Sequence, residues 1–114
     1  MTFKIMVTDL IPKDTDRILC VKVGKVIREN LYEMTRKYWK IKLERASKAT
    51  HVLAIINGEV VAVYKPQEWK LTENKDYLGR IEFTGVEDVH SEYIGKSVKN
   101  FFGRYPGPAL YINM

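Results

Sequence analysis

The segment ENLYEMTRKYWKIK, residues 29–42, contains the side chains best suited to binding another molecule. It places three aromatic residues, Tyr32, Tyr38 and Trp39, among four basic ones: Arg36, Lys37, Lys40 and Lys42. Aromatic faces with positive charges beside them are what proteins use to hold unpaired or flipped bases. The segment therefore indicates either a surface for nucleic acid or a helix whose aromatic residues are core.

The same segment has the features of a short helix. Asn30 followed three residues later by Glu33 resembles a capping box, which predicts that the helix begins there. Non-charged residues then recur at three- and four-residue spacings: Leu31, Met34, Thr35 and Tyr38. We expect Leu31, Met34 and Tyr38 to form the buried stripe, and we expect Arg36, Trp39 and the lysines that follow to form the candidate surface. With equal weight, Arg36 could instead pair with Glu33 or Glu82 and hold the helix to a sheet.

Positive charge is concentrated in the first half of the chain. The net charge is +5, and residues 1–50 carry 12 Lys and Arg against 6 Asp and Glu, whereas residues 51–114 carry 7 against 8. A polyanion would be attracted to the basic half, with Lys40, Lys42, Arg45 and Lys48 as candidate contacts to a phosphate backbone. The alternative, given equal weight, is a solvated helix face.

No pattern in the chain predicts catalysis or a metal site. The fragment IGKS, residues 94–97, lacks the earlier glycine of a phosphate-binding loop, because His90 stands in that position. His51 and His90 are far apart in sequence and show no metal-ligand spacing. Cys20 lies in an apolar run and is expected to be a buried, inert thiol. We therefore predict no catalytic residue, no metal and no cofactor.

Length and composition predict one domain, comprising an edge strand or arm at residues 1–16 and a core at residues 17–114. No run of 18 apolar residues is present, so we expect a cytoplasmic protein with no membrane partner. The strongest local signal is Asn57-Gly58 between two apolar runs, which predicts a two-residue hairpin pairing Ile56 with Glu59, Ile55 with Val60 and Ala54 with Val61. Further strands are expected at residues 17–23, 76–86 and 108–114, and further helices at residues 43–49 and 91–102. The predicted class is α+β, with a small curved, mostly antiparallel sheet or open barrel.

Several segments in order match a known pattern: Tyr32-Glu33-x-Thr35-Arg36-x-x-Trp39, then EVVAVYKPQEW, then RIEFTGV, YIGKSV and YPGPALYIN. Over residues 18–113 the chain resembles a little-characterised bacterial and phage module, itself similar to the PUA-like (ASCH/EVE-type) small domains. That resemblance implies a PUA-like fold and a role in binding nucleic acid or recognising a base, next to restriction or defence enzymes. Lys37 and Gly107 depart from the pattern, where the module has Gly and Asn.

Our functional hypothesis is a non-catalytic nucleic-acid-binding domain that recognises a modified or flipped base, in DNA or RNA, in a defence or phage context. A nuclease or other defence protein is the expected protein partner. The candidate nucleic-acid-binding residues are Tyr32, Thr35, Arg36, Trp39, Lys40, Lys42, Arg45, Trp69, Arg80, Lys96 and Ser97. The alternatives are a protein-interaction module that uses the basic face, and a small nucleotide hydrolase, which would need an acid–base pair. An exposed sheet edge would leave dimerisation open.

Overall fold

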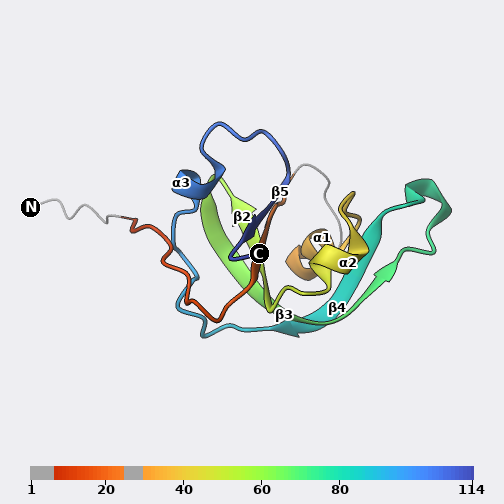
Figure 1. Ribbon diagram of the computed structural model, residues 1–114, viewed down its shortest axis with the longest axis horizontal. Helices are drawn as coiled ribbons and strands as arrows, with labels where there is room; N and C mark the ends of the chain where they lie inside the picture. Colours follow the sequence, from red (N-terminus) through yellow and green to blue (C-terminus); the bar gives the residue numbers. More distant parts are fainter. Residues whose placement is uncertain (1–6, 25–29) are drawn as a thin grey trace, which may run out of the picture.

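The computed structural model describes residues 7–24 and 30–114, which form an α+β domain built on one five-stranded sheet (Figure 1). The strands are β1 (Ile18–Lys22), β2 (His51–Ile56), β3 (Glu59–Leu71), β4 (Ile81–Glu87) and β5 (Ala109–Ile112). The short helices are α1 (Leu31–Arg36), α2 (Leu43–Ala46) and α3 (Lys99–Phe102), with a 3-10 turn at Lys75–Tyr77. The order of helices and strands along the chain agrees with the predicted one.

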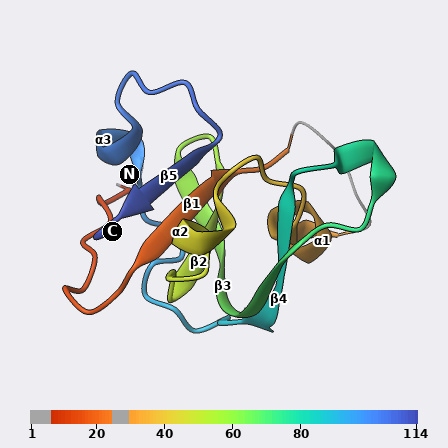
Figure 2. The same ribbon diagram turned by 45° about the vertical axis from the view of Figure 1, so that its right-hand side comes forward.

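The sheet is mixed and open, with strand order β4-β3-β2-β1-β5. β1 pairs with β2 in parallel, and all other neighbours are antiparallel. Figure 2 shows α1 and α2 on the same side of this sheet, with the long hairpin of β3 and β4 extending beyond them. The predicted mostly antiparallel, curved sheet is confirmed as a class, and its edges are β4 and β5.

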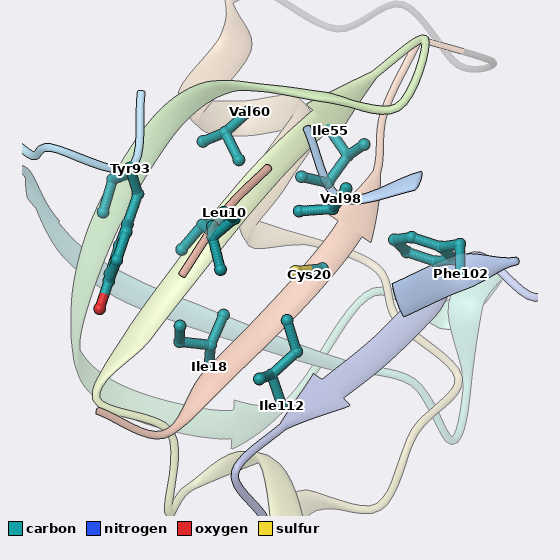
Figure 3. Close-up of a cluster of buried hydrophobic side chains, with 11 residues drawn as sticks. Leu10, Ile18, Cys20, Ile55, Val60, Tyr93, Val98, Phe102 and Ile112 are labelled. Carbon is teal, nitrogen blue, oxygen red and sulfur yellow. The ribbon is translucent and has the colours of Figure 1, made fainter. Parts of the chain in front are cut away.

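Both faces of the sheet are covered, which explains why its central strands show no polar alternation. On β1, Ile18 and Cys20 point into one core, whereas Leu19 and Val21 point into the other. Successive side chains of a strand point to opposite faces, so a strand buried on both sides must be apolar throughout. Figure 3 shows the first core, in which the described segment around Leu10 covers the sheet. The second core lies under α1 and α2.

Helix α1 is shorter than the predicted stripe. Asn30 caps it as expected, with its side-chain oxygen accepting a hydrogen bond from the Glu33 backbone N–H at 2.9 Å. The helix ends at Arg36, and Lys37 is extended, with φ of −156°. Trp39 then forms an isolated bridge with Ile81 on β4, so residues 38 and 39 do not continue the helical stripe. The backbone N–H and C=O of Trp39 bond Ile81 on β4, at 3.0 and 2.9 Å, in place of the partners that another helical turn would have supplied.

The predicted residue pairing of the hairpin is confirmed for the two pairs next to the turn and is wrong for the third pair. Ile56 pairs with Glu59 and Ile55 pairs with Val60, as Asn57-Gly58 predicts. A β-bulge then shifts the register, so that Ala54 pairs with Ala62 rather than Val61. The extra residue of a bulge is left unpaired, and Val61 is 39% exposed while both of its neighbours are buried.

The predicted helix at residues 91–102 is mostly wrong. Only Lys99–Phe102 is helical, and turns occupy the preceding residues. Gly95 has φ of +85°, a left-handed conformation that a right-handed helix cannot contain. In the segment that follows, Ser97 bridges to Asp9 and to Glu59.

The predicted arm at residues 1–16 is described only from residue 7 onward, so residues 1–6 lie outside the described part. Asp9 bridges to Ser97, and the Leu10 backbone N–H donates to the Ser97 carbonyl at 2.8 Å. Leu10 is 3% exposed and belongs to the first core. This part of the arm therefore packs on the domain.

Candidate functional site

Two predicted site residues on α1 face the protein interior. Thr35 is fully buried, and its hydroxyl donates to the Leu31 carbonyl at 2.7 Å. The Tyr32 hydroxyl accepts a hydrogen bond from the Gly85 backbone N–H at 3.0 Å, and its ring lies 5.4 Å from that of Tyr64. The Tyr32 contacts hold α1 against β3 and β4, and both side chains have a structural role.

Arg36 is the main connection between α1 and the sheet. Its Nε donates to the Phe83 carbonyl at 2.8 Å, and its two terminal nitrogens lie 3.2 Å from Glu33 and 3.3 Å from Glu82. The arginine side chain is only 13% exposed. Lys37 also contacts Glu33, at 2.7 Å, and a hydrogen bond from Lys37 lowers the pKa of that carboxyl. Of the two roles considered for Arg36, these contacts favour the structural one.

The two tryptophans lie in different environments. Trp39 donates its indole N–H to the Thr35 carbonyl at 2.7 Å and packs partly against the second core. Trp69 packs on Phe83, with ring centroids 4.8 Å apart, and its buried indole N–H has no hydrogen-bond partner in the described part of the chain. Trp39 also lines a pocket together with Arg80, but Trp69 does not.

This pocket, which we call the Tyr38 pocket, has a volume of about 360 Å³. Its side chains come from the end of β1, from α1 and the segment after it, and from the turn between β3 and β4: Lys22, Met34, Lys37, Tyr38, Trp39, Lys40, Tyr77 and Arg80. The volume falls in the range of pockets that hold small ligands, about 300–1,000 Å³. The tertiary fold thus brings together cations and rings that lie far apart in the sequence.

Two stacked tyrosines form one part of the Tyr38 pocket. The rings of Tyr38 and Tyr77 are 4.2 Å apart and only 12° from parallel. The Arg80 guanidinium lies 5.6 Å from the Tyr77 ring and donates to the Tyr38 carbonyl at 3.4 Å. Tyr38 was expected in the buried stripe, whereas it is half-buried at the pocket. Tyr77 was not among the predicted site residues. The one sequence signal for it is its position near a turn between two strands.

The electrostatic character of the Tyr38 pocket is positive. Four of its side chains are Lys or Arg, and no Asp or Glu occurs among its described lining residues. Lys37 is paired with Glu33, a contact that raises the pKa of the lysine and keeps it charged. Lys22 lies 4.5 Å from the Phe102 ring. The pocket can therefore attract an anion and offer aromatic surface to a flat group.

The basic side chains continue from the Tyr38 pocket across α2. Lys40, Lys42, Arg45 and Lys48 are exposed, and none of the four forms an ion pair with a residue of the described part. The Arg45 guanidinium lies 4.1 Å from the Tyr111 ring. We call these four residues the basic face.

Lys96 and Ser97 lie elsewhere and hold the described part of the N-terminal arm. Lys96 donates from Nζ to the Thr8 hydroxyl at 2.8 Å, and Ser97 is 8% exposed. The Ser97 backbone N–H donates to the Thr8 carbonyl at 2.9 Å. Neither residue lines the Tyr38 pocket, so the predicted set does not form one site.

A second pocket, of about 480 Å³, contains an acid–base pair that no sequence pattern predicted. His51 Nδ1 lies 3.9 Å from an Asp16 carboxylate oxygen and 2.7 Å from the Thr50 hydroxyl. That hydroxyl donates to the Arg17 carbonyl at 3.1 Å, so the contact with His51 is satisfied when Nδ1 is the donor. Burial lowers the pKa of His51, with Asp16 opposing the shift. Nε2 is then the proton acceptor.

Carboxylates outnumber lysines around His51. The pocket is lined by Asp16, Asp88 and Glu92 but by only two cationic side chains, Lys13 and Lys65. Lys13 pairs with Glu92 at 3.1 Å, and Lys65 lies 3.8 Å from Asp88. This second pocket therefore does not attract a polyanion.

The described residues contain no group of three or more His, Cys, Asp or Glu that could hold a metal ion. Among these same residues, no helix has the length and apolar character needed to cross a bilayer. No protein-family model, curated protein or solved structure matches the chain. The two pockets and the basic face are therefore the features of the described residues that bear on function.

Proposed function

We propose that this protein binds nucleic acid without catalysis, holding a base or its phosphate in the Tyr38 pocket. The observation that carries the proposal is the stacked pair of Tyr38 and Tyr77 in a pocket whose charged side chains are all cationic among its described residues. Aromatic rings bind bases of any sequence by stacking, and Lys and Arg neutralise the backbone. A modified or flipped base is the ligand that best suits a pocket rather than a flat surface.

The sequence resemblance supports the same role. A PUA-like fold would place a base-recognising pocket on a small curved β-domain, and the order of helices and strands here is compatible with that proposal. A role beside a nuclease or other defence protein is also part of the proposal, carried by the resemblance alone.

The nucleotide-hydrolase alternative is disfavoured by charge. The acid–base pair that it needs is present as His51 and Asp16, but its pocket holds three carboxylates against two lysines. A nucleotide carries several negative charges, so this balance repels it. The protein-interaction alternative uses the same basic face and is separated from the proposal by experiment.

The test is a fluorescence-anisotropy titration with labelled single- and double-stranded DNA and RNA, with and without modified cytosines, at about 50 mM and 200 mM salt. We expect salt-sensitive binding that is weakened, but not abolished, in Arg80→Gln and Tyr77→Leu, because the basic face remains. Lys65→Gln is the matched control, since it removes an exposed cation from the other pocket. If no nucleic acid binds at the lower salt concentration, the proposal is wrong and the basic face belongs to an acidic protein partner.

Base recognition has its own readout in the same titration. If the Tyr38 pocket reads one base form, the preference for that form disappears in Tyr77→Leu while residual binding to the basic face remains. Equal affinity for all base forms in the unmodified protein would contradict base recognition and leave sequence-independent binding.

A further inference from the structure

A third pocket lies at the other end of β1 from the Tyr38 pocket. We call it the Arg45 pocket; it has a volume of about 440 Å³ and is lined by Arg17, Arg45, Lys48, Asn113 and Met114. Three of its five residues are cationic, and no Asp or Glu side chain occurs among its described lining residues.

The Arg45 pocket repeats the combination found in the Tyr38 pocket. Arg45 places its guanidinium 4.1 Å from the Tyr111 ring, as Arg80 does at 5.6 Å over Tyr77. A guanidinium plane held over a ring is itself a surface on which a base can stack. Arg45 is exposed and Tyr111 is half-buried, so the guanidinium is the part accessible from solvent.

The distance between the two pockets follows from strand geometry. Arg17 immediately precedes β1, and Lys22 is its last residue. Five residue steps at about 3.3 Å each place the two positions about 17 Å apart. One nucleic-acid strand carries a phosphate about every 3.4 Å when stacked, so this span corresponds to about five nucleotides, and to fewer in an extended strand.

The connection between the pockets is basic. The segment from Lys40 in the Tyr38 pocket to Arg45 in the Arg45 pocket also carries Lys42 and one acid, Glu44, so that three exposed cations stand against one exposed carboxylate. None of the three has an ionic partner within the described ranges, residues 7–24 and 30–114. In Figure 2 the chain leaves α1, runs beside β4 and returns to α2 in front of the sheet.

We infer that the Tyr38 pocket, the basic face and the Arg45 pocket form one continuous site for single-stranded nucleic acid of about five nucleotides. The inference rests on the proposed function and specifies its ligand. Unpaired bases can stack at both ends, whereas the bases of a duplex are stacked on each other. A helix that reads a duplex lies in the major groove, but α2, the helix that carries part of the basic face, has only four residues, about 6 Å of helix.

The experiment measures affinity against oligonucleotide length. Labelled DNA and RNA strands of eight nucleotides are displaced by unlabelled strands of two, four, six and eight nucleotides and by a duplex. We expect affinity to rise steeply up to about five nucleotides and then to level off. We expect the duplex to bind more weakly than a single strand of equal length.

A double variant, Arg45→Gln with Lys48→Gln, removes the charge of the distant pocket. Each lost phosphate contact reduces the salt slope of a single strand by about 0.7, which is about fourfold in affinity near 0.15 M salt. We therefore expect about tenfold weaker binding of the six-nucleotide strand and unchanged binding of the dinucleotide. The control, Lys65→Gln with Arg104→Gln, removes two exposed cations outside the site and leaves both affinities unchanged. Thermal unfolding checks that both variants fold.

The outcomes separate the inference from the proposal beneath it. If none of the oligonucleotides binds, both the continuous site and the proposed function are wrong. Binding that is equally weakened for short and long strands, or not weakened at all by the double variant, overturns the continuous site while the Tyr38 pocket stands. The same holds if the control variant loses as much affinity, or if the duplex binds as tightly as the single strand.

Discussion

Replacing Arg36 by methionine tests whether this residue is structural. Methionine retains much of the apolar stem while removing the guanidinium, which makes three contacts: with the Phe83 carbonyl at 2.8 Å, Glu33 at 3.2 Å and Glu82 at 3.3 Å. Because the arginine and Glu82 side chains are only 13% and 12% exposed, the groups left behind stay largely out of water. The loss is therefore a desolvation cost as well as a lost contact.

The loss of folding free energy depends on which contacts remain after Arg36 is replaced. The Phe83 carbonyl loses a charge-assisted hydrogen bond worth about 1.5–3 kcal/mol. Glu33 keeps Lys37 at 2.7 Å, and Glu82 keeps only Lys70, at 3.9 Å. The expected loss is about 2–4 kcal/mol, at or just below the low end of the about 3–5 kcal/mol for breaking a fully buried ion pair. At about 4 °C per kcal/mol for a domain of this size, Tm falls by about 8–16 °C.

Urea unfolding followed by circular dichroism measures this difference. Arg104→Met is the matched control, because Arg104 is exposed and should change the free energy of unfolding by less than about 0.5 kcal/mol. A double-mutant cycle of Arg36→Met with Glu82→Gln should give a coupling energy of about 1–3 kcal/mol. A loss below about 0.5 kcal/mol for Arg36→Met would refute the structural role and return the residue to the list of ligand contacts.

Three further predictions concern buried groups. Trp39→Phe should destabilise the fold more than Trp69→Phe, measured by urea unfolding, because among the described residues the Trp39 indole N–H has a hydrogen-bond partner and the buried Trp69 indole N–H has none, so that removing the second donor relieves an unpaired group; equal losses would contradict this. Burial raises the pKa of the Cys20 thiol to about 12, so at pH 8 a thiol reagent should modify the protein only after unfolding, and rapid labelling of the native state would count against the fold. Burial lowers the pKa of His51, so between the unfolded-state value of about 6.5 and the folded-state value the unfolded chain binds more protons, and stability falls as pH falls. His51→Gln should flatten that slope in pH-dependent urea unfolding; an unchanged slope in this variant would refute the assignment.

The central hairpin could be predicted from the sequence because its turn residues have a strong conformational preference of their own. Asn57-Gly58 has the positive φ values that a two-residue turn requires, +52° and +77°. The apolar runs on either side predicted strands, and β2 is buried from Val52 to Ile55. The β-bulge that shifts the register between Ala54 and Ile55 could not be predicted from the sequence, because the register beyond the turn is set by packing rather than by the turn residues.

The site was harder to predict from the sequence than the fold, as Arg36 and Tyr38 show. Both residues were assigned from helical spacing, but the helix ends at Arg36. The next residues pair with the edge of β4 at Ile81, a contact 42 positions away along the chain. No local pattern specifies which sheet edge a segment pairs with, so the sequence left both roles of Arg36 open and placed Tyr38 in the buried stripe rather than at the pocket that it lines.

The amino-acid sequence by itself determined the α+β class, the order of helices and strands, the capped start of α1, the central hairpin and the excess of positive charge in the first half of the chain. These follow from side-chain periodicity, capping and turn chemistry, which act over a few residues. Only the tertiary structure decided that Tyr77 stacks on Tyr38, that Arg36 is held between two glutamates, and that His51 meets Asp16. Contacts between distant segments depend on strand order and register, which emerge when both faces of the sheet are packed at once.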